Sequence, residues 1–435
     1  MTKVLYFIDD GNRLEKAQLI DHLKNNVDLT IVTHDQRTYE RYHKILKTFL
    51  IKPKQKRRIF RGLLKCLLVK PLNTNNRLYR NKRQFYNTNL IMKIMLFIKK
   101  YYQKMIFFNC SVAQIYKWVY PFTYKEYDFL NNYSYFLYSP ISIKSYFIVH
   151  EARRRKLKII NWIYSWDNPM KDNESIKGAD YYFVWNKENK NDLKKYHMIS
   201  ESKIHIVGPL QFDYLIENKS RDIDEYKKQK YVLYVCAHGI REHVEQEVIN
   251  ILGIKNMLNT IDSSVELIVR PYPFIIDMNW YTNLVESGIK LDPIPSKWDP
   301  YKLTEDDLVK KKNQLSHALC VINFSSTIVL EASFTKTPII QIKFSFDNNW
   351  PDTLHINQTL KNPHLKHLLL DDYPNICNSK ESMRIALSDI LQGHSKKYMD
   401  YSNKLQEFAH PISECKGYKQ IFEQTLQKIC SEKME

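Results

Sequence analysis

Short apolar runs alternate with helical patterns along most of the chain, and this alternation is the feature that most limits how the chain can fold. Before a polar stretch at 217–230, strands are expected at 3–8, 29–33, 135–138, 159–164, 181–185 and 204–207, and helices at 16–24, 143–155 and 187–196. After it, strands are expected at 231–236, 265–269, 318–322 and 338–342, and helices at 242–258 and 327–334. Alternation of this length predicts α/β domains with parallel sheets wound by helices.

The length of 435 residues allows two or three domains, each with its own core. We expect an N-terminal Rossmann-like domain over 1–216 and a C-terminal one over 228–395, the two facing a cleft, with C-terminal helices over 396–435. Residues 41–125 are expected to form a basic, mostly helical insertion in the N-terminal domain. Because open parallel sheets bind ligands at the carboxyl ends of their strands, functional residues should directly follow the strands.

Composition excludes several classes of protein. With only nine glycines, the chain lacks the Gly-rich phosphate loops of P-loop and GxGxxG proteins. Its seven cysteines include no CxxC pair, which argues against a disulfide framework or a zinc knuckle and favours a reducing compartment. The first apolar run, 4–8, is far shorter than a signal-peptide core, and no run approaches the roughly 20 apolar residues of a membrane span. We therefore expect a cytoplasmic protein.

The positive charge is concentrated in one segment. Residues 41–125 contain 21 Lys and Arg and no Asp or Glu, so that this segment carries +21 and the rest of the chain −2. Arg57, Arg58, Arg61 and Lys65 alternate with apolar residues at helical spacing, as in a helix lying on an anionic membrane, where each basic residue adds about 1 kcal/mol. The solvated face of ordinary core helices is the plain alternative. Nucleic-acid binding is less favoured because no recognised binding signature is present.

The loop after the expected strand at 318–322 is the clearest candidate site. Ser325 and Ser326 are typical helix N-caps, and with Thr327 they precede a helix whose N-terminus favours a phosphate. Glu331 lies one turn further on the same face, where a carboxylate can accept both hydroxyls of a ribose. The alternative is a capped core helix whose glutamate points to solvent.

Two further loops of the C-terminal half carry basic residues. His238, Gly239 and Arg241 follow the strand expected at 231–236. The side chains of His238 and Arg241 could contact a diphosphate, and Gly239 allows that diphosphate to come close to the backbone. Arg270 ends the strand expected at 265–269 and is followed by prolines that fix the loop. A surface turn for the first loop and a structural salt bridge for Arg270 remain alternatives.

In the N-terminal half, carboxylates follow two expected strands. Asp10 and Asn12 follow the first strand, and Asp167 and Asn168 end a Pro-fixed turn after the strand at 159–164. Either aspartate can act as a general base toward an acceptor hydroxyl. Asx-turn chemistry explains both loops equally well.

In order along the chain, these segments resemble bacterial surface-polysaccharide glycosyltransferases of the GT-B fold. Ser165-Trp166-Asp167-Asn168 resembles their SWDN motif, and it is followed by YFVWN at 182–186, KIHIVGPLQFD at 203–213 and the strand–Ser–Ser–Thr–helix–Glu–Ala element. The resemblance covers about residues 130–345, and the order and spacing of the motifs supply its specificity. The CDP-glycerol glycerophosphotransferase branch, which makes teichoic-acid-like polymers, shares the same set.

The resemblance implies a nucleotide-activated donor held by the C-terminal domain and an acceptor against the N-terminal domain. Expected donor-binding residues are Gly239, Arg241, Arg270, Ser325, Ser326, Thr327 and Glu331, and expected acceptor-binding residues are Asn12, Trp166 and Asn168. The family loop commonly reads Arg-Pro-His-Pro, whereas Tyr272 stands at the third position here, so that any role of this histidine is open or passes to His238.

We expect an enzyme that moves a sugar from a nucleotide sugar to a cell-surface polysaccharide, such as capsule or lipopolysaccharide, or to a lipid-linked glycan. No metal or other cofactor is expected, because helix N-termini and basic side chains can neutralise the leaving diphosphate. Asp10, Asp167 and His238 are the expected catalytic residues. The expected location is peripheral, on the anionic inner face of the cytoplasmic membrane, and nucleic acid is not an expected partner.

Three other functions remain open. The first is glycerophosphate transfer from CDP-glycerol on the same scaffold. The second is a UDP-sugar 2-epimerase, which needs no lipid-linked acceptor and which the long basic segment argues against. The third is a non-catalytic protein that binds membranes or polyanions.

Overall fold

The computed structural model describes residues 3–8, 14–51, 125–139, 146–171, 178–216, 223–237, 241–273, 278–293, 304–324, 326–347, 363–412 and 417–431. The chain divides into two compact units. Unit 1 comprises the described residues as far as Gln211 and those from Pro411 onward, and unit 2 comprises the described residues from Phe212 to His410.

Unit 1 is built on a seven-stranded sheet in the order β3-β2-β1-β4-β5-β6-β7, and its pairings are all parallel. Its strands are β1 (Lys3–Ile8), β2 (Asp28–Thr33), β3 (Thr48–Leu50), β4 (Tyr135–Tyr138), β5 (Lys158–Trp162), β6 (Tyr181–Val184) and β7 (Ile204–Ile206). In β1 and β2, five consecutive residues are buried, as is typical of parallel strands covered on both faces. The strand order reverses between β1 and β4, where doubly wound sheets bind ligands.

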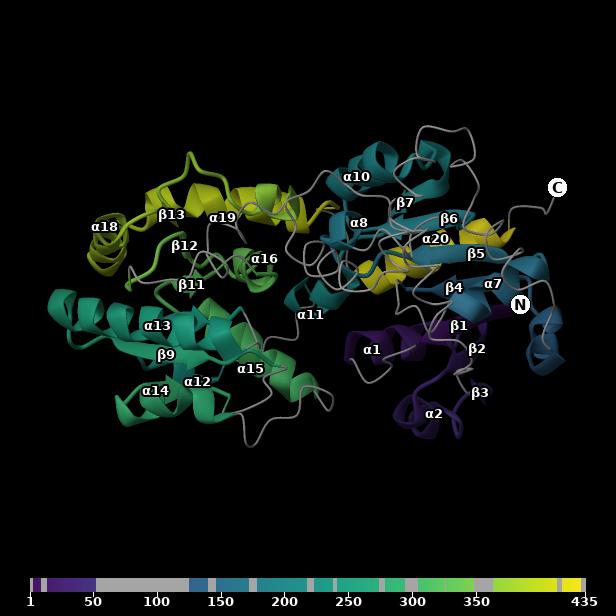
Figure 1. Ribbon diagram of the computed structural model, residues 1–435, viewed down its shortest axis with the longest axis horizontal. Coiled ribbons are helices and arrows are strands. Elements are labelled where there is room, and N and C mark those ends of the chain that lie inside the picture. The colour runs from purple at the N-terminus through teal and green to yellow at the C-terminus, as the bar shows by residue number, and fades with distance from the viewer. Residues whose placement is uncertain are drawn as a thin grey trace, which may run out of the picture. The chain divides into compact units, whose positions relative to one another are not determined.

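Helices connect these strands and cover the sheet (Figure 1). They are α1 (Leu14–Leu23), α2 (Gln36–Tyr42), η2 (Lys125–Asn132), α7 (Tyr146–Arg154), α8 (Asn168–Lys171), α10 (Lys187–His197), η4 (Glu201–Lys203) and α20 (Tyr418–Ser431), with η5 (Leu210–Phe212) at the boundary of the two units. The apolar core between the sheet and the helices α7 and η2 includes Phe7, Phe136 and Ile148.

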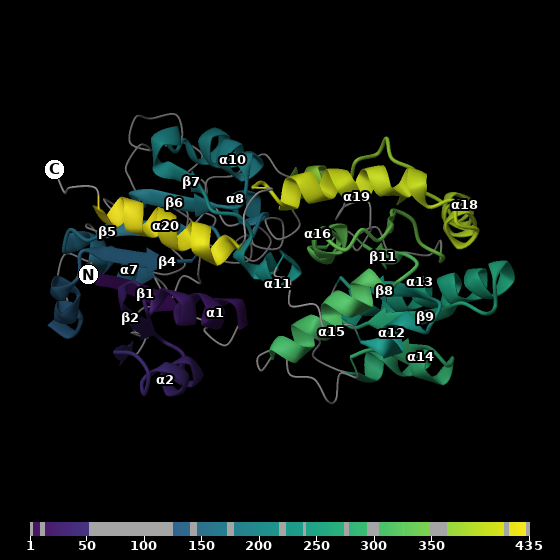
Figure 2. The same cartoon turned by 180° about the vertical axis from the view of Figure 1, so that it is seen from behind.

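Helix α20 follows unit 2 in the sequence but packs on unit 1. It lies beside β5 in both Figure 1 and Figure 2. Phe422 makes edge-to-face contacts with Trp162 and Phe183, with ring centroids 5.3 Å and 4.9 Å away. Gly208 has a φ of +80°, and a Cβ there would lie 2.1 Å from the Tyr418 ring. Only glycine therefore allows the start of α20 to lie against the chain at this position.

Unit 2 contains a six-stranded parallel sheet in the order β10-β9-β8-β11-β12-β13. Its strands are β8 (Tyr231–Val235), β9 (Glu266–Arg270), β10 (Lys290–Leu291), β11 (Val321–Asn323), β12 (Ile339–Ile342) and β13 (Ile376–Cys377). The strand order reverses between β8 and β11, which marks the expected ligand edge of this unit.

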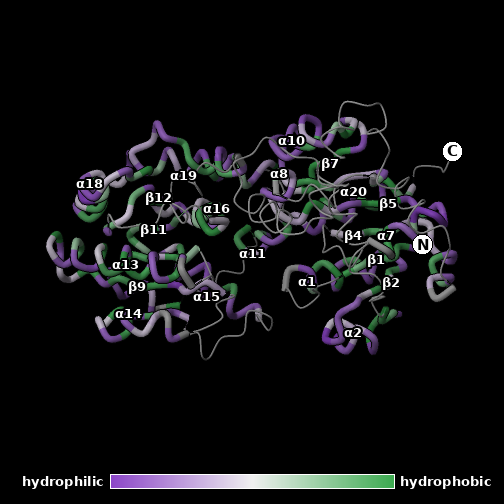
Figure 3. Tube along the Cα trace, in the orientation of Figure 1, coloured by the Kyte–Doolittle hydropathy of each residue, from purple (hydrophilic) through white to green (hydrophobic). Residues whose placement is uncertain are grey.

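The helices of unit 2 are α11 (Asp213–Ile216), α12 (Asp224–Lys227), α13 (Arg241–Ile261), η6 (Met278–Tyr281), α14 (Thr282–Glu286), α15 (Glu305–Ser316), α16 (Ile328–Ser333), η9 (Pro363–His367), α18 (Lys380–Leu391) and α19 (Lys396–Ala409). In Figure 3 they alternate hydrophilic and hydrophobic colours along their length, as expected when one face is buried. Val244, Ile251 and Leu258 of α13 belong to the core of the unit.

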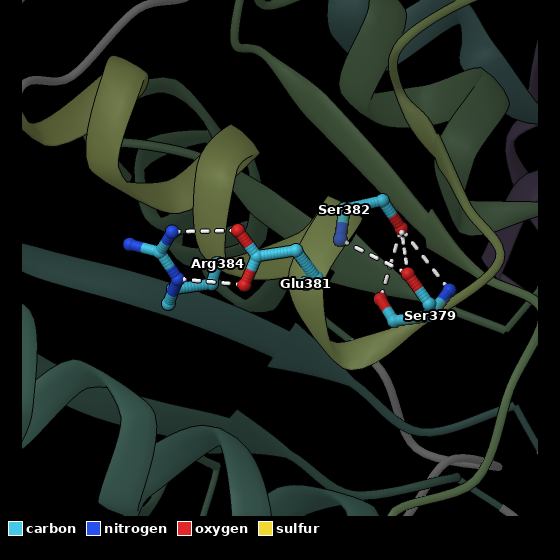
Figure 4. Close-up of polar contacts among 4 residues, drawn as sticks. All are labelled: Ser379, Glu381, Ser382 and Arg384. Atoms are coloured by element: carbon cyan, nitrogen blue, oxygen red, sulfur yellow. Dashed lines mark hydrogen bonds and ion pairs between the residues drawn. The ribbon is translucent and has the colours of Figure 1, made fainter.

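Local hydrogen bonds define the start of α18 (Figure 4). Ser382 N donates to Ser379 Oγ over 3.1 Å and Ser379 N donates to Ser382 Oγ over 3.0 Å, which forms a capping box. Arg384 donates to both carboxylate oxygens of Glu381, over 2.9 Å and 2.6 Å. A cap of this kind contributes about 1 kcal/mol, and the exposed ion pair less.

The predicted fold class is confirmed: the chain is α/β, with two Rossmann-like units. Each of the ten predicted strands is present, with ends that differ by up to three residues. β3, β10 and β13, which have two or three residues each at the edges of their sheets, were not predicted. Most of the predicted basic insertion lies outside the described residues, whereas its first residues form the end of α2 and β3. Of the predicted C-terminal helices, α19 belongs to unit 2 and α20 to unit 1.

Candidate functional site

The carboxyl edge of the unit 2 sheet collects most of the predicted donor-binding residues that the structure describes. The loops after β8, β9 and β11 all open at this edge because the strands are parallel. Arg270 ends β9, while Ser326 and Thr327 follow β11. Arg241 begins α13. The structure does not describe its side chain, and it does not describe residues 238–240 and Ser325. His238 and Gly239 therefore stay predictions.

Asn323 ties the ends of β8 and β11 together. It is fully buried, and its Nδ2 donates to the Val235 carbonyl over 2.6 Å. Its Oδ1 accepts from Ser326 N over 2.7 Å and from Ser326 Oγ over 3.1 Å. One amide side chain thus fixes the loop at the switch point of the sheet.

The predicted N-caps of the following helix are wrong in detail. Thr327 occupies the N-cap position of α16, with helical backbone and no side-chain capping bond. Ser326 instead bonds to Asn323, because the buried amide lies within reach of its N–H and hydroxyl. α16 is also short, from Ile328 to Ser333.

A buried carboxylate supports the loop after β8. Glu247 Oε1 accepts from Ala237 N over 2.9 Å and from Tyr234 OH over 3.3 Å. Burial raises the pKa of the neighbouring Cys236 thiol, and the nearby charge of Glu247 raises this pKa further. The carboxylate therefore holds the first residues of a loop that was predicted to contact the donor.

Arg270 is held between the sheet and α15. Its Nη1 donates to Gln314 Oε1 over 2.9 Å, and Gln314 Nε2 donates to the Asp292 carbonyl over 3.0 Å. Burial lowers the pKa of Arg270, and the negative charge of Glu331 is the largest effect that opposes this. The guanidinium is thus fixed by Gln314 and feels the charge of the carboxylate that was predicted to bind ribose.

Glu331 is buried, with 8% of its surface exposed. The Tyr214 hydroxyl donates to its Oε2, and Lys311 Nζ forms an ion pair with the same oxygen. The alternative that Glu331 points to solvent is therefore not what the structure shows. Arg270, Lys311 and Glu331 form a cluster of two cations and one carboxylate, referred to below as the Glu331 cluster.

Three polar neighbours in this region were not predicted, namely Tyr214, Lys311 and Gln314. Tyr214 lies on α11, and the other two lie one turn apart on α15. None of them directly follows a strand, and they reach the edge only through the packing of helices. The (i, i+3) spacing of Lys311 and Gln314 shows that they share a helix face, but it does not show what that face contacts.

In unit 1, the turn that contains the SWDN motif is held by a hydrogen bond within the turn and by another from α10. Ser165 N donates to Asn168 Oδ1 over 2.9 Å, and Asn189 Nδ2 donates to the Trp166 carbonyl over 2.7 Å. Trp166 is buried, with 3% of its surface exposed, whereas Asp167 and Asn168 are half-buried. Asp167 is therefore the predicted base that the structure places at the carboxyl end of β5. Asp10 and Asn12 lie outside the description.

The structure does not test two other predictions. The first concerns Arg57, Arg58, Arg61 and Lys65, which lie outside the described residues. Within the described part of the chain, no helix is long and apolar enough to cross a membrane.

The second concerns the metal. The described residues also contain no group of three or more His, Cys, Asp or Glu side chains that could hold a metal ion.

No protein-family model matches the chain, and no curated protein matches its sequence. Solved structures do match. One is a candidate UDP-N-acetylglucosamine 2-epimerase from Listeria monocytogenes, with 13% identity and a TM-score of 0.53, covering 99% of this chain and 96% of that one. Another is MnaA of S. aureus with UDP, with 12% identity and a TM-score of 0.50, covering 93% and 91%. A third is a variant of the wall teichoic acid polymerase TagF, with 12% identity and a TM-score of 0.50, covering 100% and 90%.

These similarities define the fold class, which is GT-B, in agreement with the sequence resemblance. At this level of identity they establish the fold of the chain, while its reaction and substrate have to be argued from its own residues.

Proposed function

We propose that the chain is a GT-B transferase that takes a sugar from a nucleotide-sugar donor and attaches it to a cell-surface polysaccharide or a lipid-linked glycan, without a metal. The observation that carries the proposal is the Glu331 cluster beside the loop fixed by Asn323, at the switch point of unit 2. A carboxylate suits ribose hydroxyls, and a partly buried guanidinium suits a diphosphate. The UDP complex of MnaA, a protein of the same fold class, supports a nucleotide ligand for this chain.

In the proposed reaction, an acceptor hydroxyl attacks the anomeric carbon of the donor sugar and the bond from that carbon to the diphosphate oxygen breaks. The nucleoside diphosphate leaves with the bonding electrons, and its added charge is stabilised by Arg270 and by backbone N–H groups. The acceptor proton passes to Asp167 or Asp10 if the configuration inverts. If the configuration is retained, the acceptor proton passes to the oxygen of the leaving diphosphate, and these side chains orient the acceptor instead.

A thermal-shift panel of UDP, CMP, CDP, GDP and dTDP tests the proposal. A nucleotide that binds should stabilise the protein by about 2.7 kcal/mol at 100 times its dissociation constant. UDP, GDP or dTDP would favour a sugar donor, and CMP an acidic sugar. A response to CDP alone would favour glycerophosphate transfer, a function for which the fold shared with the TagF variant provides support. The absence of any shift would contradict the proposal and favour a non-catalytic binding protein.

The epimerase alternative is supported by the fold shared with the Listeria monocytogenes protein. It differs from the transferase in its product, because an epimerase inverts one sugar carbon and releases no nucleoside diphosphate. Incubation with UDP-N-acetylglucosamine in the absence of acceptor, followed by NMR, separates the two functions. Conversion to the 2-epimer would contradict transfer as the main activity.

We also propose that the basic segment 41–125 binds anionic membrane, on the basis of its +21 charge. Co-sedimentation should show strong binding to vesicles that contain phosphatidylglycerol and little binding to neutral vesicles. Replacing Arg57, Arg58, Arg61 and Lys65 by glutamine should abolish most of this binding. The control removes the same charge from exposed lysines of the two units, namely Lys194, Lys195, Lys227 and Lys228. Equal binding to both kinds of vesicle would contradict the proposal.

A further inference from the structure

Glu331 is contacted through a single oxygen by two side chains from separate elements. Tyr214 of α11 donates its hydroxyl to Oε2, and Lys311 of α15 pairs with the same atom. Lys311 Nζ also lies 5.6 Å from the centroid of the Tyr214 ring, within cation–π range. The three side chains therefore hold one another in place, and neither contact uses Oε1.

The same face of α15 also holds Arg270. Gln314 lies three residues after Lys311 and accepts from the Arg270 guanidinium over 2.9 Å. The main-chain carbonyl of Gln314 in turn accepts a hydrogen bond from the buried Tyr231 hydroxyl over 2.7 Å. This helix thus places an ammonium group against Glu331 and fixes a guanidinium nearby, so that two cations act on one carboxylate.

This arrangement has a chemical consequence for Glu331. The side chain of Lys311 is 19% exposed and that of Glu331 is 10% exposed, so that water screens their attraction only in part. A carboxylate held against an ammonium group offers its remaining oxygen as a hydrogen-bond acceptor. With Oε2 anchored by Tyr214 and Lys311, the carboxylate has a fixed direction before any ligand arrives, and a preorganised group loses less entropy on binding.

We propose that Lys311 and Tyr214 are positioning residues that hold Glu331 ready for the ribose hydroxyls of the donor, and thereby make the site selective for ribonucleotides. This inference rests on the proposed function, since it concerns the same donor site. Lys311 and Tyr214 act only through the carboxylate and do not touch the ligand. Their loss should therefore weaken the recognition of the ribose 2′-hydroxyl specifically, rather than nucleotide binding in general.

The test compares ribo- and 2′-deoxyribonucleoside diphosphates by calorimetry, with UDP against dUDP and CDP against dCDP. One hydrogen bond to a charged group corresponds to roughly tenfold or more in affinity, so the wild-type protein should bind the preferred ribonucleotide about tenfold more tightly than its deoxy form. Lys311→Met should bring this ratio to within about twofold. Lys311→Arg, which keeps the cation, should preserve it.

Two further variants separate positioning from general damage. Tyr214→Phe removes one hydroxyl, and it should lower the ribo/deoxy ratio even if Lys311→Met does not fold. In a Glu331→Ala background, Lys311→Met should have no additional effect on the ratio. A purely structural role for Lys311 would weaken both nucleotides alike.

The outcomes distinguish the two proposals. If the wild-type protein binds a nucleotide but Lys311→Met and Tyr214→Phe keep its ribo/deoxy ratio, the positioning role is wrong and the proposed function stands. A wild-type protein that binds both forms equally likewise contradicts the positioning role alone. If dTDP alone binds, the positioning role is wrong and the proposed function stands. If no nucleotide of the panel binds, both proposals fail.

Discussion

Replacing Phe422 by alanine is expected to lower the free energy of unfolding of unit 1 by about 4 kcal/mol. The side chain is fully buried and closes the contact between α20 and the sheet. Its ring meets Trp162 and Phe183 edge to face, and such pairs add about 0.5–1.5 kcal/mol beyond the burial of apolar area. Truncation leaves a cavity between two aromatic side chains that have little freedom to collapse into it.

Urea unfolding followed by circular dichroism, together with hydrogen exchange, measures this effect. Amides of β5 and β6 should lose protection in the variant, whereas those of β8 and β11 in unit 2 should keep it. Gln424→Ala is the matched control, because Gln424 is exposed on the same helix and its replacement should change stability by less than about 0.5 kcal/mol. A loss below 1 kcal/mol, or an equal loss of protection in both units, would contradict the expectation.

This contact joins two parts of unit 1 that unit 2 separates in the sequence. Unit 1 begins with β1 and is completed only when α20 covers β5 and β6 and the Tyr135 hydroxyl donates to the Ile429 carbonyl over 3.1 Å. All of unit 2 lies between these segments in the chain. The folded state of unit 1 therefore depends on a segment that follows the whole of unit 2, and the sequence shows only an amphipathic helix there.

The strands were predictable because their signal is local. β1 and β8 each contain a continuous apolar run of five residues, and such runs between helical patterns are characteristic of a buried parallel strand. β3, β10 and β13 have two or three residues at the edges of their sheets, and they pair only because a longer neighbour offers free backbone groups. The tertiary fold determines which strand lies beside each of them, and a local sequence pattern does not contain this information.

The residues of the candidate site also divide into those with a local sequence signal and those that only the tertiary fold brings to the site. Arg270, Ser326 and Glu331 were predictable because each follows a strand or belongs to a recognisable motif. Lys311 and Tyr214 were not, since Lys311 lies 20 residues before its partner Glu331 and on a different helix. The assignment of Trp166 to the acceptor came from the motif alone, and the structure buries this ring.

Replacing Asn323 by alanine is expected to lower the free energy of unfolding by about 3 kcal/mol and to remove most nucleotide-induced stabilisation. The change leaves the buried Val235 carbonyl without the amide that donates to it and Ser326 N–H without its acceptor, and each such orphaned group costs about 1–3 kcal/mol. The loop at the switch point then loses its fixed shape.

Thermal and urea unfolding with and without UDP or CDP measure both effects of Asn323→Ala. Ser326→Ala is the matched control, because it removes only the 3.1 Å hydroxyl contact to Asn323 and keeps the backbone bond. It should cost less than about 1 kcal/mol, and any nucleotide binding that it loses measures the contribution of the Ser326 hydroxyl, which was predicted to contact the donor. If Asn323→Ala binds nucleotide as the control does, then the shape of this loop does not determine binding, and the Glu331 cluster alone has to supply the donor affinity.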